Sequence, residues 1–513
     1  MRSKRKRGIS FGSGMGDRRE GRKKTELWDL ALLCVSIGFY LLYPLMDGPV
    51  WCVDSGGYVS MHITREPLYP AFLGLCRGMA GILQVDALVI TVILQSLLAG
   101  ITTWYAGKVI RDMKNGSRVL QVAAILFQFA VTILCRFAAG RGSAYTDSIL
   151  TEGVGLSLYV LFMISLFLYV RTRRSRHLWL TFLLAFLLIS LRKQMMITLL
   201  IMGITFAWYI LIRERQIRKF LCLAAMIAAV LIAGKVFDRT YQYAVRGEWM
   251  EHSGNSMGLL CTLLYSSDVE TDQALIEDET VQALYSEIMR QADAQHLLYK
   301  YAGSGWLTVS SHYADSYDRI GYGIINPVVE GYIRENFDCT ETEAARKYDE
   351  ICGEMSRALM RQRLMPRLKV YIYNLWKGLV NSVAQANRLL SLYTVAAYMA
   401  AAVMARYLVR RGSALQRQIR SGPDKESLQE EERMQAVNGE IGTSLCFTFI
   451  VMTGIVVNAL TVGFIIFAQP RYMIYSMGLF YTAVCMMGYD IVCLTRAYDS
   501  RIISSKVQMP HKA

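Results

Sequence analysis

Long apolar runs separated by short charged connections dominate the chain. The hydrocarbon core of a bilayer is about 30 Å thick, so a helix that crosses it needs about 20 predominantly apolar residues. Ten segments meet or approach this length, and they lie at 28–46, 86–109, 119–135, 153–170, 177–191, 194–212, 219–237, 388–408, 441–468 and 472–494. The pattern predicts an all-α fold, a polytopic transmembrane helical bundle of about ten spans.

Lys and Arg gather in alternate connections between these runs. With the N-terminus inside, the inner connections are 1–27, 110–118, 171–176, 213–218, 409–440 and 495–513. The outer connections are much poorer in Lys and Arg, as the positive-inside rule requires. We therefore expect both termini on the inner face. The basic tail at 1–27 is too long before the first apolar run for a cleaved signal peptide, so the first span is expected to be a permanent anchor.

Composition supports a membrane protein and excludes several other classes. Of the 513 residues, 53% are hydrophobic and only 19% are charged, against about 25% charged in a typical soluble domain. The net charge is +15, but residues 239–370 contain 20 acidic and 13 basic side chains. A basic chain with one large acidic outer segment is typical of a membrane protein and not of a nucleic-acid binder.

The outer segment 239–370 is too long to be a structureless loop in a compact protein. Thr340 and Glu343 fit a capping box, and the three-to-four spacing of apolar residues from Tyr348 onward predicts a helix that Pro366 ends. We expect a small, mainly helical extracytoplasmic domain. It separates a membrane core of seven spans at 28–238 from a C-terminal part at 371–513 with three spans.

Three shorter features leave alternatives open. Residues 371–387 either cross the membrane, which would invert everything after them, or lie as an amphipathic helix at the outer interface, which we favour. Residues 421–440, within the inner connection 409–440, are interpreted as a flexible linker. Cys339 and Cys352 are candidates for a disulfide, and no cysteine or histidine pair has zinc spacing.

The first outer loop, at 47–85, contains the most informative stretch. Asp54 and Tyr58 are four residues apart and would share a helical face, while Arg65 and Glu66 precede a rigid Pro-Leu-Tyr-Pro sequence. A carboxylate held just outside a membrane helix is what a general base for a lipid-bound substrate needs. In the structural alternative, Asp54 caps a helix and Glu66 pairs with Arg65 in water.

The second outer loop, at 136–152, carries two further carboxylates. Asp147 and Glu152 flank the start of the fourth predicted span, at the same membrane depth as Asp54. A functional role is one interpretation. Ordinary N-capping by Asp147, with a favourable helix dipole, is the other, and the two are compatible.

Basic residues lie at the outer ends of later spans. Arg192 and Lys193 follow a span of only about 15 residues, near 22 Å at 1.5 Å per residue, and so lie close to the hydrocarbon boundary. Arg471 lies between the last two spans and has a guanidinium suited to phosphate oxygens. Charged groups at this depth are often functional, although snorkelling to the interface is the alternative.

Taken together, these residues resemble a known family. The matching residues are Asp54, Tyr58, Arg65, Glu66, Pro67, Tyr69 and Pro70, then Thr146, Asp147, Ser148, Thr151 and Glu152, and finally Arg471 and Tyr472. This pattern resembles the GT-C-type integral membrane glycosyltransferases, including the protein O-mannosyltransferase-like and aminoarabinose-transferase-like groups. The resemblance covers mainly the first 200 residues and the last outer loop.

The resemblance implies a sugar transfer from a polyprenyl-phosphate-linked donor to a glycan, protein or lipid acceptor outside a plasma membrane, which we expect to be bacterial. It implies that Asp54 is the catalytic carboxylate, with Glu66 beside it, and that Asp147 and Glu152 assist the acceptor or a metal. The donor phosphate would face Arg192, Lys193 and Arg471, and the substrate-binding set would also contain Tyr58, Arg65, Tyr69 and Tyr472.

The mechanism that this implies is a direct displacement in which Asp54 takes a proton from the acceptor hydroxyl. A divalent cation, Mg²⁺ or Mn²⁺, held by Asp54, Asp147 or Glu152 is compatible with these oxygen ligands. Two other function classes stay open. One is a transporter or flippase of a lipid-linked precursor, and the other is a non-catalytic membrane scaffold.

Overall fold

The computed structural model describes residues 14–138, 144–421 and 428–507. Within these residues helices are joined by short turns and irregular connections, and no strand forms apart from one isolated bridge between Val50 and Ser148. The first half contains α1 (Gly14–Asp47), α2 (Ser55–Val59), α3 (Leu68–Leu83), α4 (Ala87–Met113), α5 (Arg118–Ala138), α6 (Glu152–Thr172), α7 (Ser175–Leu191), η1 (Lys193–Met196), α8 (Ile197–Phe206), η2 (Ala207–Glu214) and α9 (Ile217–Arg246).

The described residues of the second half also form helices joined by short connections. It contains α10 (Met257–Tyr265), α11 (Val269–Gln273), α12 (Glu279–Ala294), η3 (Tyr299–Tyr301), α13 (Trp306–Ile320), η4 (Gly321–Ile325), α14 (Asn326–Asn336), α15 (Glu341–Leu359), α16 (Leu364–Asn381), α17 (Arg388–Ser421), α18 (Leu428–Ile465), α19 (Pro470–Met473), η5 (Ile474–Ser476) and α20 (Met477–Val507).

Eight segments of the described chain are long and apolar enough to cross a membrane. They are Thr25–Asp47, Ala87–Met113, Glu152–Thr172, Lys193–Ile212, Ile217–Arg246, Arg388–Ala414, Val437–Ile465 and Pro470–Arg496. Each contains or overlaps one of the ten predicted spans. The other two predictions, 119–135 and 177–191, fall on shorter apolar segments of α5 and α7. α7 has 17 residues, about 26 Å of helix, slightly less than the hydrocarbon core.

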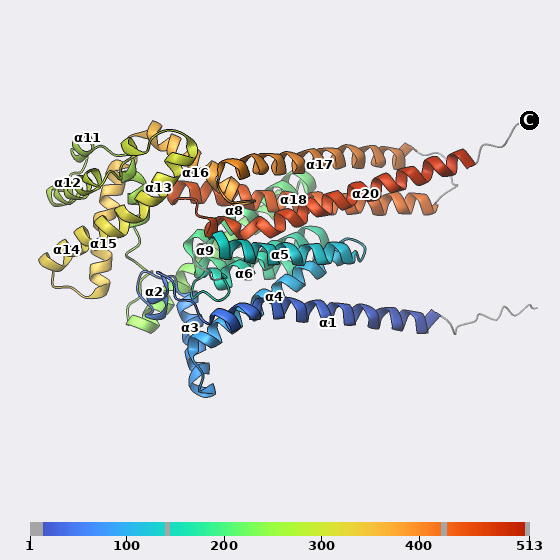
Figure 1. Ribbon diagram of the computed structural model, residues 1–513, viewed down its shortest axis with the longest axis horizontal. Helices are drawn as coiled ribbons and strands as arrows, with labels where there is room; N and C mark the ends of the chain where they lie inside the picture. Colours follow the sequence, from blue (N-terminus) through green and yellow to red (C-terminus); the bar gives the residue numbers. More distant parts are fainter. Residues whose placement is uncertain (1–13, 139–143, 422–427, 508–513) are drawn as a thin grey trace, which may run out of the picture.

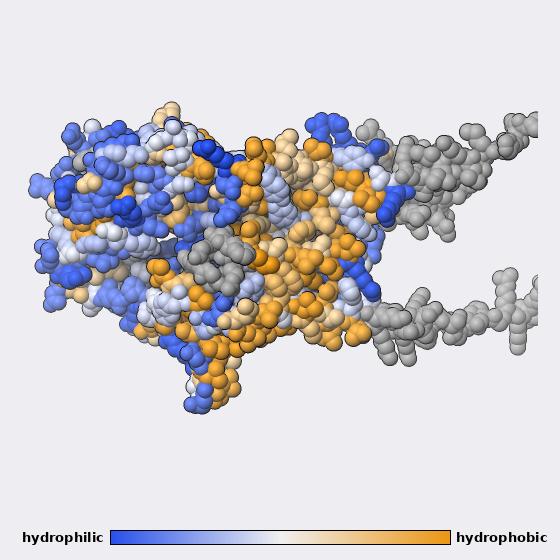
Figure 2. All heavy atoms as spheres, viewed as in Figure 1, coloured by the Kyte–Doolittle hydropathy of each residue, from blue (hydrophilic) through white to orange (hydrophobic). Residues whose placement is uncertain are grey.

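The molecule is elongated, and the domain formed by α10–α15, which we call the outer domain after its predicted location, lies at one end of the helical bundle (Figure 1). α1 begins, and α20 ends, at the opposite end of the bundle from α11, α12, α14 and α15. In Figure 2 an apolar surface covers the middle of the bundle on the face that is shown, between a hydrophilic outer domain and a hydrophilic strip at the other end. This surface is what a bundle surrounded by lipid requires.

α6 forms the centre of the bundle. Most of its residues are buried, and Phe162, Met163 and Phe167 have no exposed surface. A helix that is apolar on all sides is enclosed by other helices, and α4, α7 and α18 contact α6. α1, α9 and α17 contain few buried residues within their apolar windows and form the periphery of the bundle.

At the end opposite the outer domain, a buried lysine joins three helices. Lys114 follows α4, and its Nζ contacts Asp490 of α20 and donates to Ser444 Oγ of α18 at 3.2 Å. Removing one member of a buried pair is costly because the other charge is left uncompensated. Glu440 lies 3.8 Å from the same Nζ. The flexible-linker prediction for 421–440 is therefore wrong for residues 428–440, which form the first turns of α18, while 422–427 lie outside the described residues.

The outer domain has a hydrophobic core of its own, formed by α10, α12, α13, α14 and α15. The predicted capping box at the start of α15 is confirmed, since the Thr340 hydroxyl accepts from Glu343 N at 3.3 Å and the Glu343 carboxylate accepts from Thr340 N at 2.9 Å. α15 already ends at Leu359. Pro366 lies instead in the first turn of α16, where a proline is tolerated because that turn needs no N–H donor.

The disulfide considered between Cys339 and Cys352 is not formed, and both thiols are free. Cys339 precedes α15, whereas Cys352 is buried about three turns into it. At 1.5 Å per residue this separation is about 16 Å, well beyond the reach of a disulfide.

α16 includes most of the segment 371–387, for which we favoured an interfacial position. Two of its asparagines, Asn374 and Asn381, are fully buried. Asn374 Nδ2 donates to the carbonyls of Gly463 and Ile466 at 3.0 and 2.8 Å, and Asn381 Nδ2 donates to Ala468 O at 2.8 Å. These amides satisfy carbonyl groups at the end of α18, which is why the segment contains so much asparagine.

Candidate functional site

The two predicted outer loops lie side by side and are joined by hydrogen bonds. Val50 N donates to Asp147 O at 2.8 Å, and Ile149 N donates to Val50 O at 3.0 Å. Ser55 Oγ donates to Ile149 O at 2.9 Å. The loops therefore form one rigid layer at the outer end of the bundle.

Asp54 lies at the N-cap position of α2, but its side chain makes no capping hydrogen bond. The capping alternative is therefore wrong. One carboxylate oxygen accepts from Arg65 Nη2 at 3.2 Å, and the other faces Arg471 Nη1 at 3.5 Å. A residue of the first loop is thus joined to one near the end of the chain.

Glu66 does not pair with Arg65 in water, as the structural alternative proposed. Its carboxylate accepts from the backbone N–H of Lys193 at 2.9 Å, which ties the first loop to the connection between α7 and η1. Among the described residues, the side-chain ammonium of Lys193 has no ion-pair partner. It is therefore the available cation at this position.

Glu152 is the centre of a buried ion-pair cluster at the start of α6. Its carboxylate accepts from Arg192 Nη1 at 2.8 Å and lies 3.9 Å from Arg471 Nε, while its side chain is only 5% exposed. Arg471 therefore stands between Asp54 and Glu152. Because both carboxylates share this guanidinium, the position of Arg471 depends on both.

Aromatic rings lie against the guanidinium groups of the site. Arg192 and Arg471 lie 4.4 and 4.7 Å from the centroid of the Tyr472 ring, and Arg65 lies 4.7 Å from that of Tyr58. Burial raises the pKa of Tyr58, so its hydroxyl stays protonated. Burial opposes the charge on Arg65, but the Asp54 carboxylate and its hydrogen bond stabilise that charge, and the pKa of Arg65 is raised.

Three predicted site residues, Glu152, Asp147 and Tyr69, do not line the cavity that the other predicted residues form. Asp147 is fully buried, its Oδ2 accepts from Ala144 N at 3.2 Å, and it is not the N-cap of α6, a position that Thr151 holds. Tyr69 is fully buried and donates to Gln95 Oε1 at 2.8 Å. Asp147 and Tyr69 stabilise the loops, and neither has access to a substrate from the cavity.

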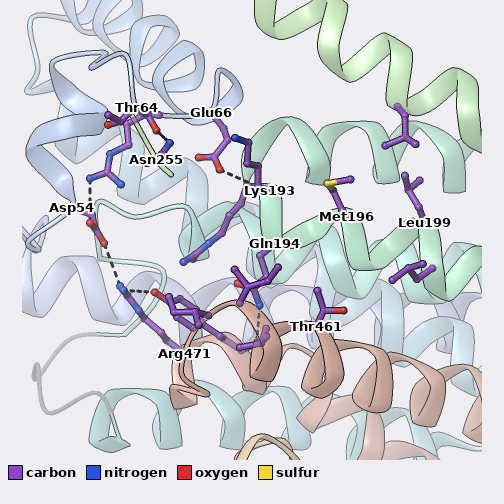
Figure 3. Close-up of a pocket in the computed structure, with 18 of the residues that line it drawn as sticks. Asp54, Thr64, Glu66, Lys193, Gln194, Met196, Leu199, Asn255, Thr461 and Arg471 are labelled. Atoms are coloured by element: carbon purple, nitrogen blue, oxygen red, sulfur yellow. Dashed lines mark hydrogen bonds and ion pairs between the residues drawn. The ribbon is translucent and has the colours of Figure 1, made fainter. Parts of the chain in front are cut away.

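The other predicted residues meet in one cavity of about 960 Å³ (Figure 3). The predicted site residues in its lining are Asp54, Tyr58, Arg65, Glu66, Arg192, Lys193, Arg471 and Tyr472. Glu152 lies behind these lining residues, paired with Arg192 and Arg471. Residues from both outer loops and from two later helix ends therefore converge on one charged chamber.

The second part of the cavity is an apolar groove between helices of the bundle. η1 and α8 contribute Met196, Leu199, Leu200, Gly203 and Ile204; α9 contributes Ile227 and Leu231; and α18 contributes Thr461, Val462 and Ile465. The first set follows the i, i+3, i+4, i+7 spacing of one helical face. Leu200 is 52% and Ile204 is 43% exposed, so the groove is open toward the apolar surface of the bundle.

The outer domain supplies residues that the sequence did not indicate. Asn255, Tyr317 and Tyr322 line the charged chamber on its outer side. Tyr322 is 59% exposed and lies on the short π-helical element η4, a type of element that is frequent at functional sites. Nearby on α13, partial burial raises the pKa of Asp318, although Arg471 opposes this change. The glycines on either side of Tyr322 were the only sequence signal for it.

The donor set does not favour a divalent cation held by Asp54, Asp147 and Glu152. In the described parts of the chain, no three Asp, Glu, His or Cys side chains are grouped as metal ligands would be. Asp54 and Glu152 are instead engaged by guanidinium groups, and Asp147 is buried inside its loop. Fixed arginines occupy the place that a cation would take.

Comparisons of the chain with protein-family models, with curated proteins and with solved structures find no match.

Proposed function

We propose that this chain is a membrane glycosyltransferase that moves a sugar from a polyprenyl-phosphate-linked donor to an acceptor on the outer side of a plasma membrane. One observation carries the proposal. A single cavity joins a charged chamber, which contains a carboxylate and several fixed cations, to an apolar groove that opens on the surface of the bundle. A ligand that fits both parts has an anionic head and a long apolar tail.

The groove between α8, α9 and α18 would hold the first part of the polyprenyl tail. Thr461 is the one polar residue that α8, α9 and α18 contribute to the lining. The donor phosphate would lie where the groove meets the chamber, against Lys193, Arg192 and Arg471. Guanidinium groups bind phosphate oxygens with paired hydrogen bonds, and Lys193 adds a charge that no described carboxylate neutralises.

The reaction that fits this arrangement is a direct displacement. Asp54 accepts the proton of an acceptor hydroxyl while the hydroxyl oxygen forms a bond to the anomeric carbon. The bond from that carbon to the phosphate oxygen breaks, and polyprenyl phosphate leaves with the electron pair, stabilised by the cations. In the resting structure Arg471 faces Asp54, so a phosphate that attracts Arg471 would release the carboxylate for its role as a base.

The acceptor would approach from the outer domain. Tyr322 of the outer domain lines the chamber, and it belongs to none of the helices that form the apolar groove. We expect Tyr322→Ala to raise the KM for the acceptor more than the KM for the donor. Tyr322→Phe, which keeps the ring, is the matched control.

The orientation that we propose for the protein in the membrane follows from the distribution of its charges. Both described ends of the chain lie away from the outer domain (Figure 1), and the basic connections lie at that end. We infer ten spans, with α5 and α7 crossing beside the eight longer segments, and both termini inside. The positive-inside rule supports this topology, in what we infer is a bacterial membrane.

A flippase would fit the same ligand, but it needs a polar path for the head group across the membrane. The part of the cavity that runs between the helices is lined almost wholly by apolar residues, and its charges are confined to the outer end. This distribution favours chemistry at the outer face over transport of the head group.

The test is a sugar-transfer assay in membranes that contain equal amounts of wild type, Asp54→Asn or Glu335→Gln, with a panel of radiolabelled polyprenyl-phosphate sugars as donors. Glu335 is an exposed carboxylate of α14 and serves as the control. Loss of general-base help should lower transfer by about 10²–10⁴-fold in Asp54→Asn alone. Equal transfer by all three proteins would remove Asp54 from catalysis, and no transfer from any donor would favour the flippase or scaffold.

A further inference from the structure

The outer domain contacts the part of the first outer loop that carries Arg65, one of the chamber's cations. The segment 253–256, which we name the latch turn, lies against this loop just before α10. Ser253 N donates to Ile63 O at 3.3 Å, and the Asn255 side chain donates to Thr64 O. Both acceptors are backbone carbonyls, so the contact fixes the path of the loop and not only one side chain.

The latch turn approaches the loop as closely as the backbone allows. Gly254 has a φ of +86°, and a Cβ atom on it would lie 2.9 Å from Cγ2 of Thr64. Any other residue would be strained in this conformation and would also press on Thr64. A glycine in the latch turn is therefore needed for the contact.

Asp349 of α15 organises the latch turn. Its Oδ2 accepts from Ser253 Oγ and from Gly254 N at 2.6 Å each, and its Oδ1 accepts from Ser256 N at 2.8 Å. Burial opposes ionisation of this carboxyl, but the hydrogen bonds from Ser253, Ser256 and Gly254 outweigh it and lower its pKa. One carboxylate thus fixes three of the four residues of the turn, Ser253, Gly254 and Ser256.

The loop that the latch turn holds leads directly into the chamber. Thr64 is followed by Arg65, whose guanidinium reaches Asp54 at 3.2 Å and lies over the Tyr58 ring. Thr64, Arg65 and Asn255 all line the cavity. A change at Asp349 would therefore reach Asp54 through the latch turn, the backbone of Ile63 and Thr64, and the side chain of Arg65.

We propose that Asp349 is a positioning residue through which the outer domain sets the place of Arg65, and with it the geometry of Asp54. The inference rests on the proposed function for its catalytic consequence, but not for its structural one. Asp349 does not touch the cavity, so it acts through the latch turn and not on a substrate.

The first measurement is backbone hydrogen exchange of residues 60–66 in the purified, full-length protein in detergent. We compare wild type with Asp349→Asn, and with Glu350→Gln as the matched control, since Glu350 is an exposed carboxylate on the same helix. An asparagine has one acceptor oxygen and presents an N–H donor to the turn, so it cannot accept all three hydrogen bonds. Exchange in 60–66 should rise about tenfold in Asp349→Asn and stay unchanged in Glu350→Gln.

Asn255→Ala keeps the proposal testable if Asp349→Asn unfolds the outer domain. It removes only the bond to Thr64 and should give the same local rise in exchange, with normal exchange in α12 and α15. Unchanged exchange of 60–66 in every folded variant would overturn the proposal, even if sugar transfer were lost.

Kinetics give the second readout. Loosening of Arg65 should lower kcat about 10–100-fold, since small displacements near reacting atoms have effects of this size, and should leave the donor KM within about twofold because Lys193 and Arg192 are untouched. A rise in KM at constant kcat would contradict a positioning role for Asp349. If the wild type transfers no sugar, the proposed function fails while the exchange measurement still decides the structural inference.

Discussion

The ion pair between Glu152 and Arg192 gives a quantitative prediction for the site. The change is Glu152→Gln, which keeps the shape of the side chain and removes its charge. Glu152 is 5% exposed and lies 2.8 Å from Arg192, with Arg471 at 3.9 Å. The substitution therefore leaves a guanidinium in a largely buried place without its counter-charge.

The magnitude follows from this geometry. At 2.8 Å and an effective dielectric constant of about 20, the attraction between the two charges is about 6 kcal/mol. The cost of removing both groups from water offsets part of it, and breaking a buried pair from one side typically costs about 3–5 kcal/mol. We expect Glu152→Gln to lower the free energy of unfolding by about 3 kcal/mol, since the glutamine oxygen still accepts one hydrogen bond.

The assay is unfolding of the purified protein in detergent, followed by tryptophan fluorescence, for the single variants at Glu152 and Arg192 and for the double variant Glu152→Gln/Arg192→Gln. The double variant should lose less than the sum of the single losses by about 2 kcal/mol, because neither charge is then left alone. Glu287→Gln, which breaks an exposed pair with Arg290, is the control and should leave the free energy of unfolding almost unchanged. A loss below about 1 kcal/mol for Glu152→Gln, or strict additivity in the double variant, would refute the buried pair.

Three further predictions concern the loops, the groove and the outer domain. Gly57→Ala should lower sugar transfer about tenfold, because its Cβ would lie 2.6 Å from Arg65 Nε, whereas Gly56→Ala, whose nearest neighbour is 3.8 Å away, should have little effect. Gly203→Trp should fill part of the groove and so remove van der Waals contacts of a long polyprenyl tail, which should lower transfer from a long-chain donor about tenfold. Transfer from a short-chain donor should not fall, and an equal loss with both donors would contradict tail binding in the groove. Because the pKa of Asp349 is lowered on folding, its contribution to stability is present above about pH 4 and lost as the pH falls further; thermal unfolding curves of wild type and Asp349→Asn should converge below that pH.

The fold class could be predicted from the sequence because the thickness of the bilayer fixes the length of apolar runs. The same rule limited the prediction where a helix is only slightly too short, as in α7, or continues past the membrane, as in α9, which ends at Arg246 and not near 237. Apolar length does not specify where a helix ends in water. That end depends on a cap or on a partner, such as the amides of α16 that meet the end of α18.

Much of the charged chamber could also be predicted, although Asp54 and Arg471 are 417 residues apart. Residues at the outer ends of membrane helices all lie at one level, so the topology alone brings them near each other. Asp147 lies at this level too, but its side chain turns into its own loop. Whether a side chain faces the chamber, as Asp54 does, or turns into its own loop, as Asp147 does, depends on the local backbone conformation. The spacing of residues along the chain does not reveal that conformation.

The apolar groove and the role of Tyr322 in the chamber could not be predicted from the sequence, for a different reason. α8 is apolar on all sides, so its groove-facing stripe has the same composition as its lipid-facing and core-facing stripes. Tyr322 lies in a segment with many other tyrosines and is distinguished only by its exposure beside the chamber. In both cases the chemistry of the residue is ordinary, and its position relative to other helices gives it a role.

The charges of the chamber, finally, suggest an order of substrate binding under the proposed function. The cations Arg65, Arg192, Lys193 and Arg471 exceed the carboxylates Asp54, Glu66 and Glu152 by one, which suits a singly charged phosphodiester. Before the donor binds, Arg471 is shared between Asp54 and Glu152, and the carboxylate of Asp54 is engaged on both oxygens. A phosphate that attracts Arg471 weakens one of these contacts, so Asp54 becomes a stronger acceptor of protons only when the donor is in place. Under the proposed function the donor therefore binds before the acceptor, because Asp54 can take the acceptor proton only after the donor phosphate has drawn Arg471 away.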